Sequence, residues 1–267
     1  MARALNAKVV LLHAFKVIYP SVDTIAFISA PQLKEISEIN LRQEVKAVGA
    51  SGDSNVSTLC IEGSASYTIL HAAARVTASL IIVGLKNTRN PLESLFGSTT
   101  KTLMRQSLVP LIVVPEDAPF IIPKSIALAS DVTTGTNEIV LQPLKHLAEE
   151  FKSKVYVVRV IREGLDEVLQ MLTNYTSLNV IFKNVHHTFE YITGENVADG
   201  LNHFVEDCRV NMLTVIHHEH SFLDRLFIKS NSVNILNHSH VPLLILNEKQ
   251  EDNIAVKEEE QLVLDIF

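Results

Sequence analysis

The chain has 267 residues, of which 47% are hydrophobic and 20% charged, and a formal net charge of −7. This composition predicts a globular protein with a substantial core. The acidic balance, with no compensating basic stripe, argues against a nucleic-acid partner. All apolar runs are far shorter than the roughly 18–20 residues that cross a bilayer, so no membrane partner is expected. Cys60 and Cys208 lie outside any CxxC context, which favours reduced thiols in a cytoplasmic protein.

The first half of the chain predicts four strands. Short continuous apolar runs, typical of buried parallel strands, occupy residues 8–15, 55–61, 80–84 and 110–114. The third run ends at Gly84, and a polar loop follows. Gly97-Ser98-Thr99-Thr100 then opens a segment with helical spacing. This order places backbone N–H groups and hydroxyls where a phosphate would sit, at the positive end of a helix.

The second half predicts alternating strands and helices after a short, stiff linker with three prolines, Pro115–Lys124. The predicted strands are Ser125–Ser130 (followed by Asp131), Lys154–Ile161, Asn179–Val185, Met212–His217 and Pro242–Leu246. The predicted helices are Thr133–Phe151, Gly164–Thr173, Val197–Cys208 and Phe222–His238. Such alternation implies a parallel sheet covered on both faces. The acidic tail, 249–267, is predicted to be solvated, with Leu262, Val263 and Leu264 as the residues able to dock.

The two halves repeat each other. Ala7–His13 resembles Ser153–Arg159 at an offset of 146 residues, and Val109–Val113 resembles Val241–Ile245 at an offset of 132. Between them, Leu95-Phe96 matches Leu226-Phe227 at an offset of 131. Matches in the same order indicate a tandem duplication with shorter loops in the second copy.

The first copy lacks a strand that the second copy has. Ser125 precedes Val155 by 30 residues, whereas only eight residues precede Val9, its counterpart. We therefore expect the first copy to lack its opening strand and most of the following helix. Met1–Asn6 is predicted to be the last turn of that helix. We interpret the sequence as an N-terminally truncated form, with an upstream start as the expectation.

These residues resemble the universal stress protein family in its tandem, two-domain form. The family's nucleotide signature is Gly, two residues, Gly, nine residues, Gly, then Ser or Thr. Gly84 fits the first position, Asn87 stands where the second glycine is expected, and Gly97-Ser98 fit the end. The resemblance implies an α/β fold with two Rossmann-like domains of the adenine nucleotide alpha hydrolase-like type, at residues 1–116 and 123–248. Each domain would be a parallel five-stranded sheet flanked by helices, the first without its opening strand.

The family's strand order, 3-2-1-4-5, makes the missing strand the central one. Strands 8–15 and 55–61 are therefore expected to lack the neighbour that would join them to strands 80–84 and 110–114. Family domains pair through their final strands, so the resemblance implies intrachain pairing of the two domains through strands 110–114 and 242–246. A homodimer of the paired domains is left open.

The resemblance implies a stress-response regulator that binds an adenine nucleotide, ATP, without being a dedicated enzyme. The residues expected around the phosphates are Gly84, Asn87, Gly97, Ser98 and Thr99. Val83 and Ala14 are expected near the base and ribose. No lysine follows the loop as in a P-loop ATPase, although weak ATP hydrolysis is left open.

The second copy departs from the nucleotide signature. His217 stands in place of the first glycine, and Ile228-Lys229-Ser230 stand where Gly-Ser is expected, although Asp131 keeps an acid that helps to line the family's site. The alternative function is therefore a protein-interaction scaffold of the same fold that binds no nucleotide. His217-His218-Glu219-His220, with His186-His187 at the same sheet edge, is the one candidate metal cluster. It begins where a strand ends rather than on one helix face, so no metal is expected.

Overall fold

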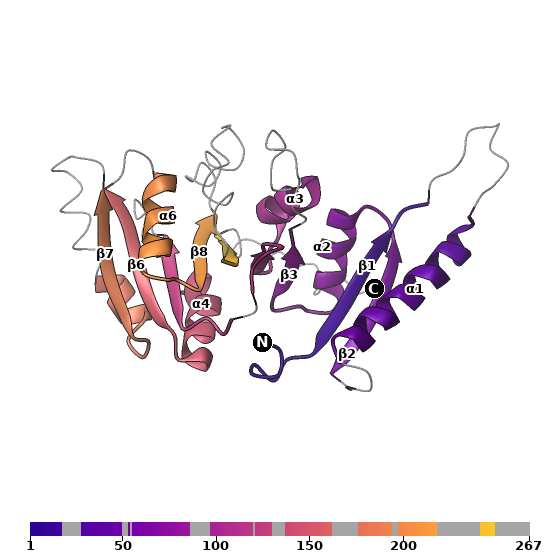
Figure 1. The fold of residues 1–267 in the computed structure, drawn as a ribbon, viewed down its shortest axis with the longest axis horizontal. Helices are drawn as coiled ribbons and strands as arrows, with labels where there is room; N and C mark the ends of the chain where they lie inside the picture. Colours follow the sequence, from indigo (N-terminus) through magenta and orange to yellow (C-terminus); the bar gives the residue numbers. More distant parts are fainter. Residues whose placement is uncertain are drawn as a thin grey trace, which may run out of the picture. The chain divides into compact units, whose positions relative to one another are not determined.

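The computed structural model describes residues 1–17, 28–49, 53, 55–85, 97–119, 121–129, 137–161, 176–193, 197–217 and 241–248. The chain divides into two compact units, Met1–Ala78 and Ser79–Phe267 (Figure 1). This division falls within the first copy of the sequence repeat. The boundary predicted between residues 116 and 123 stays a prediction.

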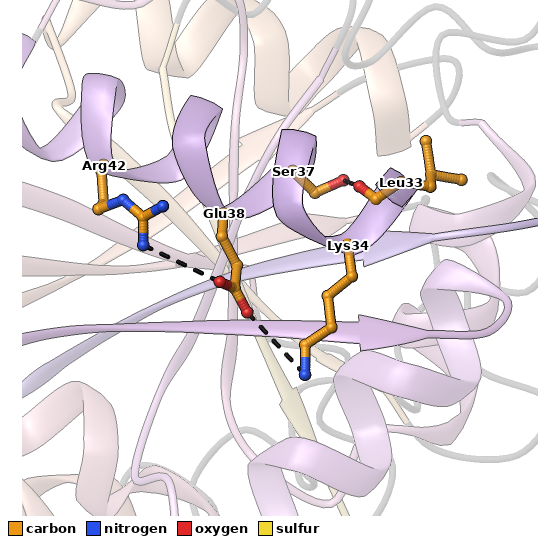
Figure 2. Close-up of polar contacts among 5 residues, drawn as sticks. All are labelled: Leu33, Lys34, Ser37, Glu38 and Arg42. Carbon is orange, nitrogen blue, oxygen red and sulfur yellow. Dashed lines mark hydrogen bonds and ion pairs between the residues drawn. The ribbon is translucent and has the colours of Figure 1, made fainter. Parts of the chain in front are cut away.

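The first unit holds a two-stranded parallel sheet, in which β1 (Val9–Phe15) pairs with β2 (Val56–Glu62). The helix α1 (Ala30–Ala47) packs on both strands, and α2 (Ala65–Arg75) packs on β1. A reciprocal capping box between Ser29 and Gln32 starts α1. On the exposed side of α1, Glu38 lies between Lys34 and Arg42 (Figure 2), and the hydroxyl of the buried Ser37 donates to the Leu33 carbonyl at 2.7 Å.

The second unit is built on a seven-stranded sheet in the order β3-β4-β9-β8-β5-β6-β7. Its strands in chain order are β3 (Ile81–Gly84), β4 (Leu111–Val114), β5 (Ser125–Ala129), β6 (Lys154–Ile161), β7 (His187–Thr193), β8 (Met212–His217) and β9 (Leu243–Asn247). All neighbours are parallel except β4 and β9, which pair antiparallel with Leu111 opposite Ile245. The β4–β9 ladder joins the two strands through which the sequence predicts the copies to pair.

Three helices of the second unit lie against this sheet, namely α3 (Ser98–Gln106), α4 (Glu138–Phe151) and α6 (Val197–Asp207). The crossovers from β5 to β6 and from β7 to β8 run in opposite directions along the sheet, so right-handed connections place α4 and α6 on opposite faces. Figure 1 shows α6 in front of the sheet and α4 behind it. The strands β7-β6-β5-β8-β9 reproduce the order 3-2-1-4-5, which confirms the α/β fold of the second copy.

The central strand of this arrangement is β5, which pairs with β6 on one side and with β8 on the other. Ile126, Ala127 and Leu128 are at most 1% exposed. In the first copy, β1 pairs with β2 and β3 pairs with β4, and no strand of the described part of the chain joins these two pairs. Among the described residues, the strands of the first copy thus form two separate pairs, as the sequence predicts.

The backbone of residues 1–7 repeats the end of α4. At the end of α4, the Lys152 N–H donates to the Glu149 carbonyl, the Ser153 N–H donates to the Ala148 carbonyl, and Lys152 is left-handed with φ 51°. The Asn6 N–H donates to the Arg3 carbonyl and the Ala7 N–H to the Ala2 carbonyl, and Asn6 has φ 48°. Residues 1–7 thus form a turn with the same hydrogen-bond pattern as the end of α4. That this turn ends a longer helix stays a prediction.

One predicted strand, Asn179–Val185, is wrong. Residues 176–181 are helical, and the strand of this region is β7, at His187–Thr193. A continuous apolar run fits either structure, and here the burial follows a helical face: Leu178, Ile181 and Phe182 are at most 4% exposed, whereas Val180 is 67% exposed. The other strands lie within about two residues of their predicted bounds. The predicted helices at 164–173 and 222–238 lie outside the described residues.

Candidate functional site

The sequence predicts two parts of a candidate site, the carboxyl end of β3 and the start of α3. β3 ends at Gly84, beside β4, and the Leu85 N–H donates to the Val114 carbonyl at 2.8 Å. Gly97 is the N-cap of α3, with an extended backbone (φ −59°, ψ 161°), and its carbonyl accepts from the Lys101 N–H at 3.1 Å. An added Cβ at Gly84 or at Gly97 would meet no atom within 4 Å among the described residues. The backbone is therefore open to close approach at both glycines.

The start of α3 carries a positive partial charge that no side chain of the described residues caps. The first N–H groups of a helix have no intrahelical acceptor, and no side chain of the described residues caps this end. The first turn contains no acidic residue, while the helix macrodipole places about half a positive charge there. An anion is the group that this arrangement favours.

The three hydroxyl residues of this turn differ in exposure. Ser98 is exposed, Thr99 is half-buried, and Thr100 is only 7% exposed. The Ser98 carbonyl accepts from the Thr102 hydroxyl at 2.9 Å. Ser98 and Thr99 are thus the first-turn side chains available to a ligand, and Thr100 belongs to the core.

A residue from the second half of the chain fixes the other end of α3. The Asn247 amide Nδ2 donates to the Ser107 carbonyl at 2.7 Å and to the Met104 carbonyl at 3.3 Å. Asn247 is 4% exposed, and Leu103, in the last turn of α3, is fully buried. Sequence analysis missed this positioning residue because its partners are 140 and 143 residues away. Its only signal was a polar residue directly after a buried apolar strand.

The predicted site residues are distributed over both units. Val83 and Gly84 lie in β3, and Gly97, Ser98 and Thr99 lie at the start of α3, all within the second unit. Ala14 lies in β1 of the first unit. Its backbone N–H and C=O groups point away from β2, because the direction of these groups alternates along a strand. Asn87 lies outside the described residues, as do Asp131 and Ile228-Lys229-Ser230.

The second copy has a different residue at the position of Gly84 from the one predicted. The Ile81 N–H donates to the Pro110 carbonyl, and the Leu213 N–H donates to the Pro242 carbonyl, so Ile81 and Leu213 are equivalent. Counting along both strands, Gly84 corresponds to Ile216 rather than to His217. The prediction of His217 at this position is therefore wrong by one residue. A branched side chain therefore replaces the open backbone at this position.

The histidines considered as metal ligands have other surroundings. The two ring nitrogens of His187 lie 2.8 Å from the Val185 carbonyl and 2.9 Å from Asn179 Oδ1, and the ring packs against Phe182 and Phe189. His187 is thus held by packing and local hydrogen bonds. Residues 218–220 lie outside the described residues, and the described ranges contain no group of three His, Cys, Asp or Glu side chains able to hold a metal ion. Within the same ranges, none of the helices has the length and apolar character to span a membrane.

A family model matches the first part of the chain. Residues 1–115 match the model of the universal stress protein family. The matched residues include β1 to β4 together with both glycines of the candidate site. No curated protein sequence matches the chain.

Solved structures extend the likeness to both halves. A universal stress protein from Archaeoglobus fulgidus DSM 4304 is similar with a TM-score of 0.63 at 12% sequence identity, covering 90% of this chain and 86% of that chain. A functionally unknown protein from Pseudomonas aeruginosa PAO1 has a TM-score of 0.57 at 12% identity, covering 92% and 95%. At these identities the likeness shows the fold alone. The second half therefore repeats the fold of the universal stress protein domain.

Proposed function

We propose that this chain is a stress-response regulator that binds an adenine nucleotide, ATP, at the start of α3. The observation that carries the proposal is the start of α3 at Gly97, which no side chain of the described residues caps and which has no acidic residue in its first turn. Gly84, at the carboxyl end of β3, has room for an added Cβ, as Gly97 does. The match of residues 1–115 to the universal stress protein family model supports the choice of an adenine nucleotide.

In this proposal the phosphates take the place of a helix cap. The N–H groups of the first turn of α3 and the Ser98 hydroxyl donate to phosphate oxygens, with Thr99 beside them. Gly84 and Gly97 allow the phosphates to approach the backbone closely. In the same proposal, Asn87 lies near the phosphates, and Val83 and Ala14 lie near the base and ribose. The hydroxyls hold the phosphates rather than attack them, so the protein works by binding and is not a dedicated enzyme.

Two substitutions of Gly97 test the site by isothermal titration calorimetry with ATP. Aspartate and asparagine are both good N-caps, so Gly97→Asp and Gly97→Asn each leave α3 folded. Aspartate adds a negative charge where the phosphates sit, and we expect Gly97→Asp to weaken binding about 10-fold or more, or about 1.4 kcal/mol. We expect Gly97→Asn to change the dissociation constant by less than about 3-fold.

A third variant controls for net charge. Gln106→Glu changes the net charge as Gly97→Asp does, but at the exposed last position of α3. It should bind ATP like the unsubstituted protein, because the macrodipole interaction falls off within one turn. Equal dissociation constants for all four proteins would reject this site. Steady phosphate release from ATP that Ser98→Ala abolishes would reject the non-enzymatic role.

The second copy favours the alternative function, a scaffold for protein interactions. Ile216 occupies the position of Gly84 there, so that strand end does not offer the same open backbone. If no nucleotide is released when freshly purified protein is denatured, and ATP gives no heat in calorimetry, the scaffold function replaces nucleotide binding for the whole chain.

A further inference from the structure

β3 is the terminal strand of the seven-stranded sheet, but its sequence is that of an interior strand. It reads Ile81-Ile82-Val83-Gly84, without a charged residue or a proline. Ile82 is 55% exposed. The opposite terminal strand, β7, carries Glu190 at its centre, as expected for an edge that must not pair further. The β3 edge lacks such protection.

The hydrogen-bonding groups of this edge alternate. The Ile81 N–H donates to the Pro110 carbonyl at 2.9 Å, and the Leu85 N–H donates to the Val114 carbonyl at 2.8 Å. Residues 81, 83 and 85 therefore face β4, and the backbone groups of Ile82 and Gly84 face away from it. The described part of the chain provides no strand on that side. At the equivalent position of the second copy, Thr214 lies opposite Leu128 of β5 and is fully buried.

We propose that the carboxyl-terminal segment Leu262–Phe267 of the same chain adds to this edge as a strand parallel to β3. The segment reads Leu-Val-Leu-Asp-Ile-Phe, which is apolar apart from one aspartate. Its length and composition are those of a strand. Bound beside β3, it would cover Ile82 and provide acceptors and donors for the backbone of Ile82 and Gly84.

The path of the chain supports this occupant over a more distant one. β9 is antiparallel to β4, with Leu111 opposite Ile245, so Asn247 lies beyond the first residue of β4. The chain thus leaves β9 at the sheet edge where β3 and β4 begin, which is where a strand parallel to β3 must also begin. No crossover over a sheet face is needed, because the added strand is antiparallel to β9.

The connecting segment is long enough. From β9, the position beside β3 is three strand spacings away, about 14 Å. The 14 residues from Glu248 to Gln261 can span up to about 46 Å. These residues include acidic and basic side chains, which favour a solvated connection along the sheet edge.

Amide hydrogen exchange, resolved by residue in NMR spectra, tests the proposal without any nucleotide. We compare the full chain with a chain that ends at Glu248. In the shortened chain the Ile82 and Gly84 amides should exchange at least about 10-fold faster, because they lose their acceptors. The Ile81 and Leu85 amides, which donate to β4, should change less than about 2-fold.

Proline substitutions repeat the test at full length. Val263→Pro and Leu264→Pro remove two successive donors, one of which must face β3, and proline does not fit within a paired strand. At least one of them should reproduce the fast exchange of Ile82 and Gly84. Val256→Pro, in the connecting segment, should leave that exchange unchanged.

Two results would overturn the proposal. Equal exchange of Ile82 and Gly84 in the full and shortened chains would mean that the segment does not cover this edge. Protection that rises with protein concentration would mean that a second copy, and not the same chain, supplies the strand.

Discussion

β3 and β8 are equivalent strands of the two copies, yet their surroundings differ. Ile82 of β3 is 55% exposed, whereas Thr214, at the same position of β8, is fully buried. β1 and β6 show the same difference: Val9 is half-buried, and its counterpart Val155 is fully buried. The second copy has β5 paired with both β6 and β8, whereas in the described part of the first copy β1 pairs only with β2 and β3 only with β4.

The helices of the two copies differ in burial in the same way as the strands. α4 lies against the complete sheet and buries six residues, namely Val140, Leu141, Leu144, Leu147, Ala148 and Phe151. α1 lies against the two-stranded sheet and buries two, Ser37 and Leu41. The residues of an apolar run are thus fully buried only where neighbouring elements cover both faces of the sheet and both edges of the strand. The comparison predicts that equivalent substitutions cost far more in the second copy.

The largest effect is expected at the central strand. Leu128→Ala, at a position 1% exposed, should lower the free energy of unfolding of the second unit by about 3 kcal/mol through lost burial and a cavity. Leu12→Ala, at a half-buried position of β1, should cost the first unit about 1 kcal/mol. Denaturant-dependent hydrogen exchange measures the free energy of unfolding of each unit separately. Equal losses in the two variants would contradict the comparison.

A smaller loss is expected for Asn247→Ala. Removing the side-chain amide leaves the buried carbonyls of Met104 and Ser107 without this donor, which should lower the free energy of unfolding by about 2 kcal/mol. Asn137→Ala, which removes the N-cap of α4, should cost about 1 kcal/mol. Urea denaturation followed by circular dichroism measures both. A loss below that of the cap variant would show that Asn247 does not anchor α3.

The strands were predictable from sequence wherever an apolar run was short and bounded by glycine, proline or polar residues. Met212–His217 was predicted with its observed bounds for this reason. Asn179–Val185 was mistaken because periodicity alone does not separate a short helix from a strand. The sequence repeat could have located this strand. Val56 pairs with Val9 in the first copy, and His187 pairs with the equivalent Val155 in the second. β7 therefore begins 131 residues after β2, which is the offset already seen between Leu95-Phe96 and Leu226-Phe227.

The candidate site was predictable only in its local part. The Gly97-Ser98 start of α3 follows from spacing, because a glycine and small hydroxyl residues before a helical pattern predict a helix start. Asn247 and the Ile216 counterpart of Gly84 depend on strand register, which is set by hydrogen bonds between distant residues. Sequence spacing across loops of unequal length does not determine that register.

Thr214→Val should stabilise the second unit. The Thr214 hydroxyl is fully buried and has no hydrogen-bond partner in the described structure. Valine has nearly the same shape without the unsatisfied oxygen, so we expect a gain of about 1 kcal/mol, measured by urea denaturation. A loss of stability in Thr214→Val would mean that the hydroxyl has a partner.

The smallest effect on stability is expected on the outer surface of α1. Glu38 lies 3.9 Å from both Lys34 and Arg42 (Figure 2), but its side chain is 40% exposed. Glu38→Gln should therefore lower the free energy of unfolding by no more than about 0.5 kcal/mol. A loss above about 1 kcal/mol would mean that such pairs offset part of the missing burial in this copy.

The same substitution has a sharper effect on Cys60. Burial raises the pKa of the Cys60 thiol, a hydrogen bond with Ser37 lowers it, Glu38 raises it further and Lys34 lowers it. Glu38→Gln removes a negative charge that disfavours the thiolate, so the pKa should fall and alkylation by iodoacetamide at pH 8 should become faster. Lys34→Gln breaks one of the same ion pairs but should slow alkylation. Both are measured in a Cys208→Ser background, so that only Cys60 reacts. Faster alkylation in both variants would mean that loosening of α1 exposes the thiol, and the first copy would then depend on these surface pairs more than its burial suggests.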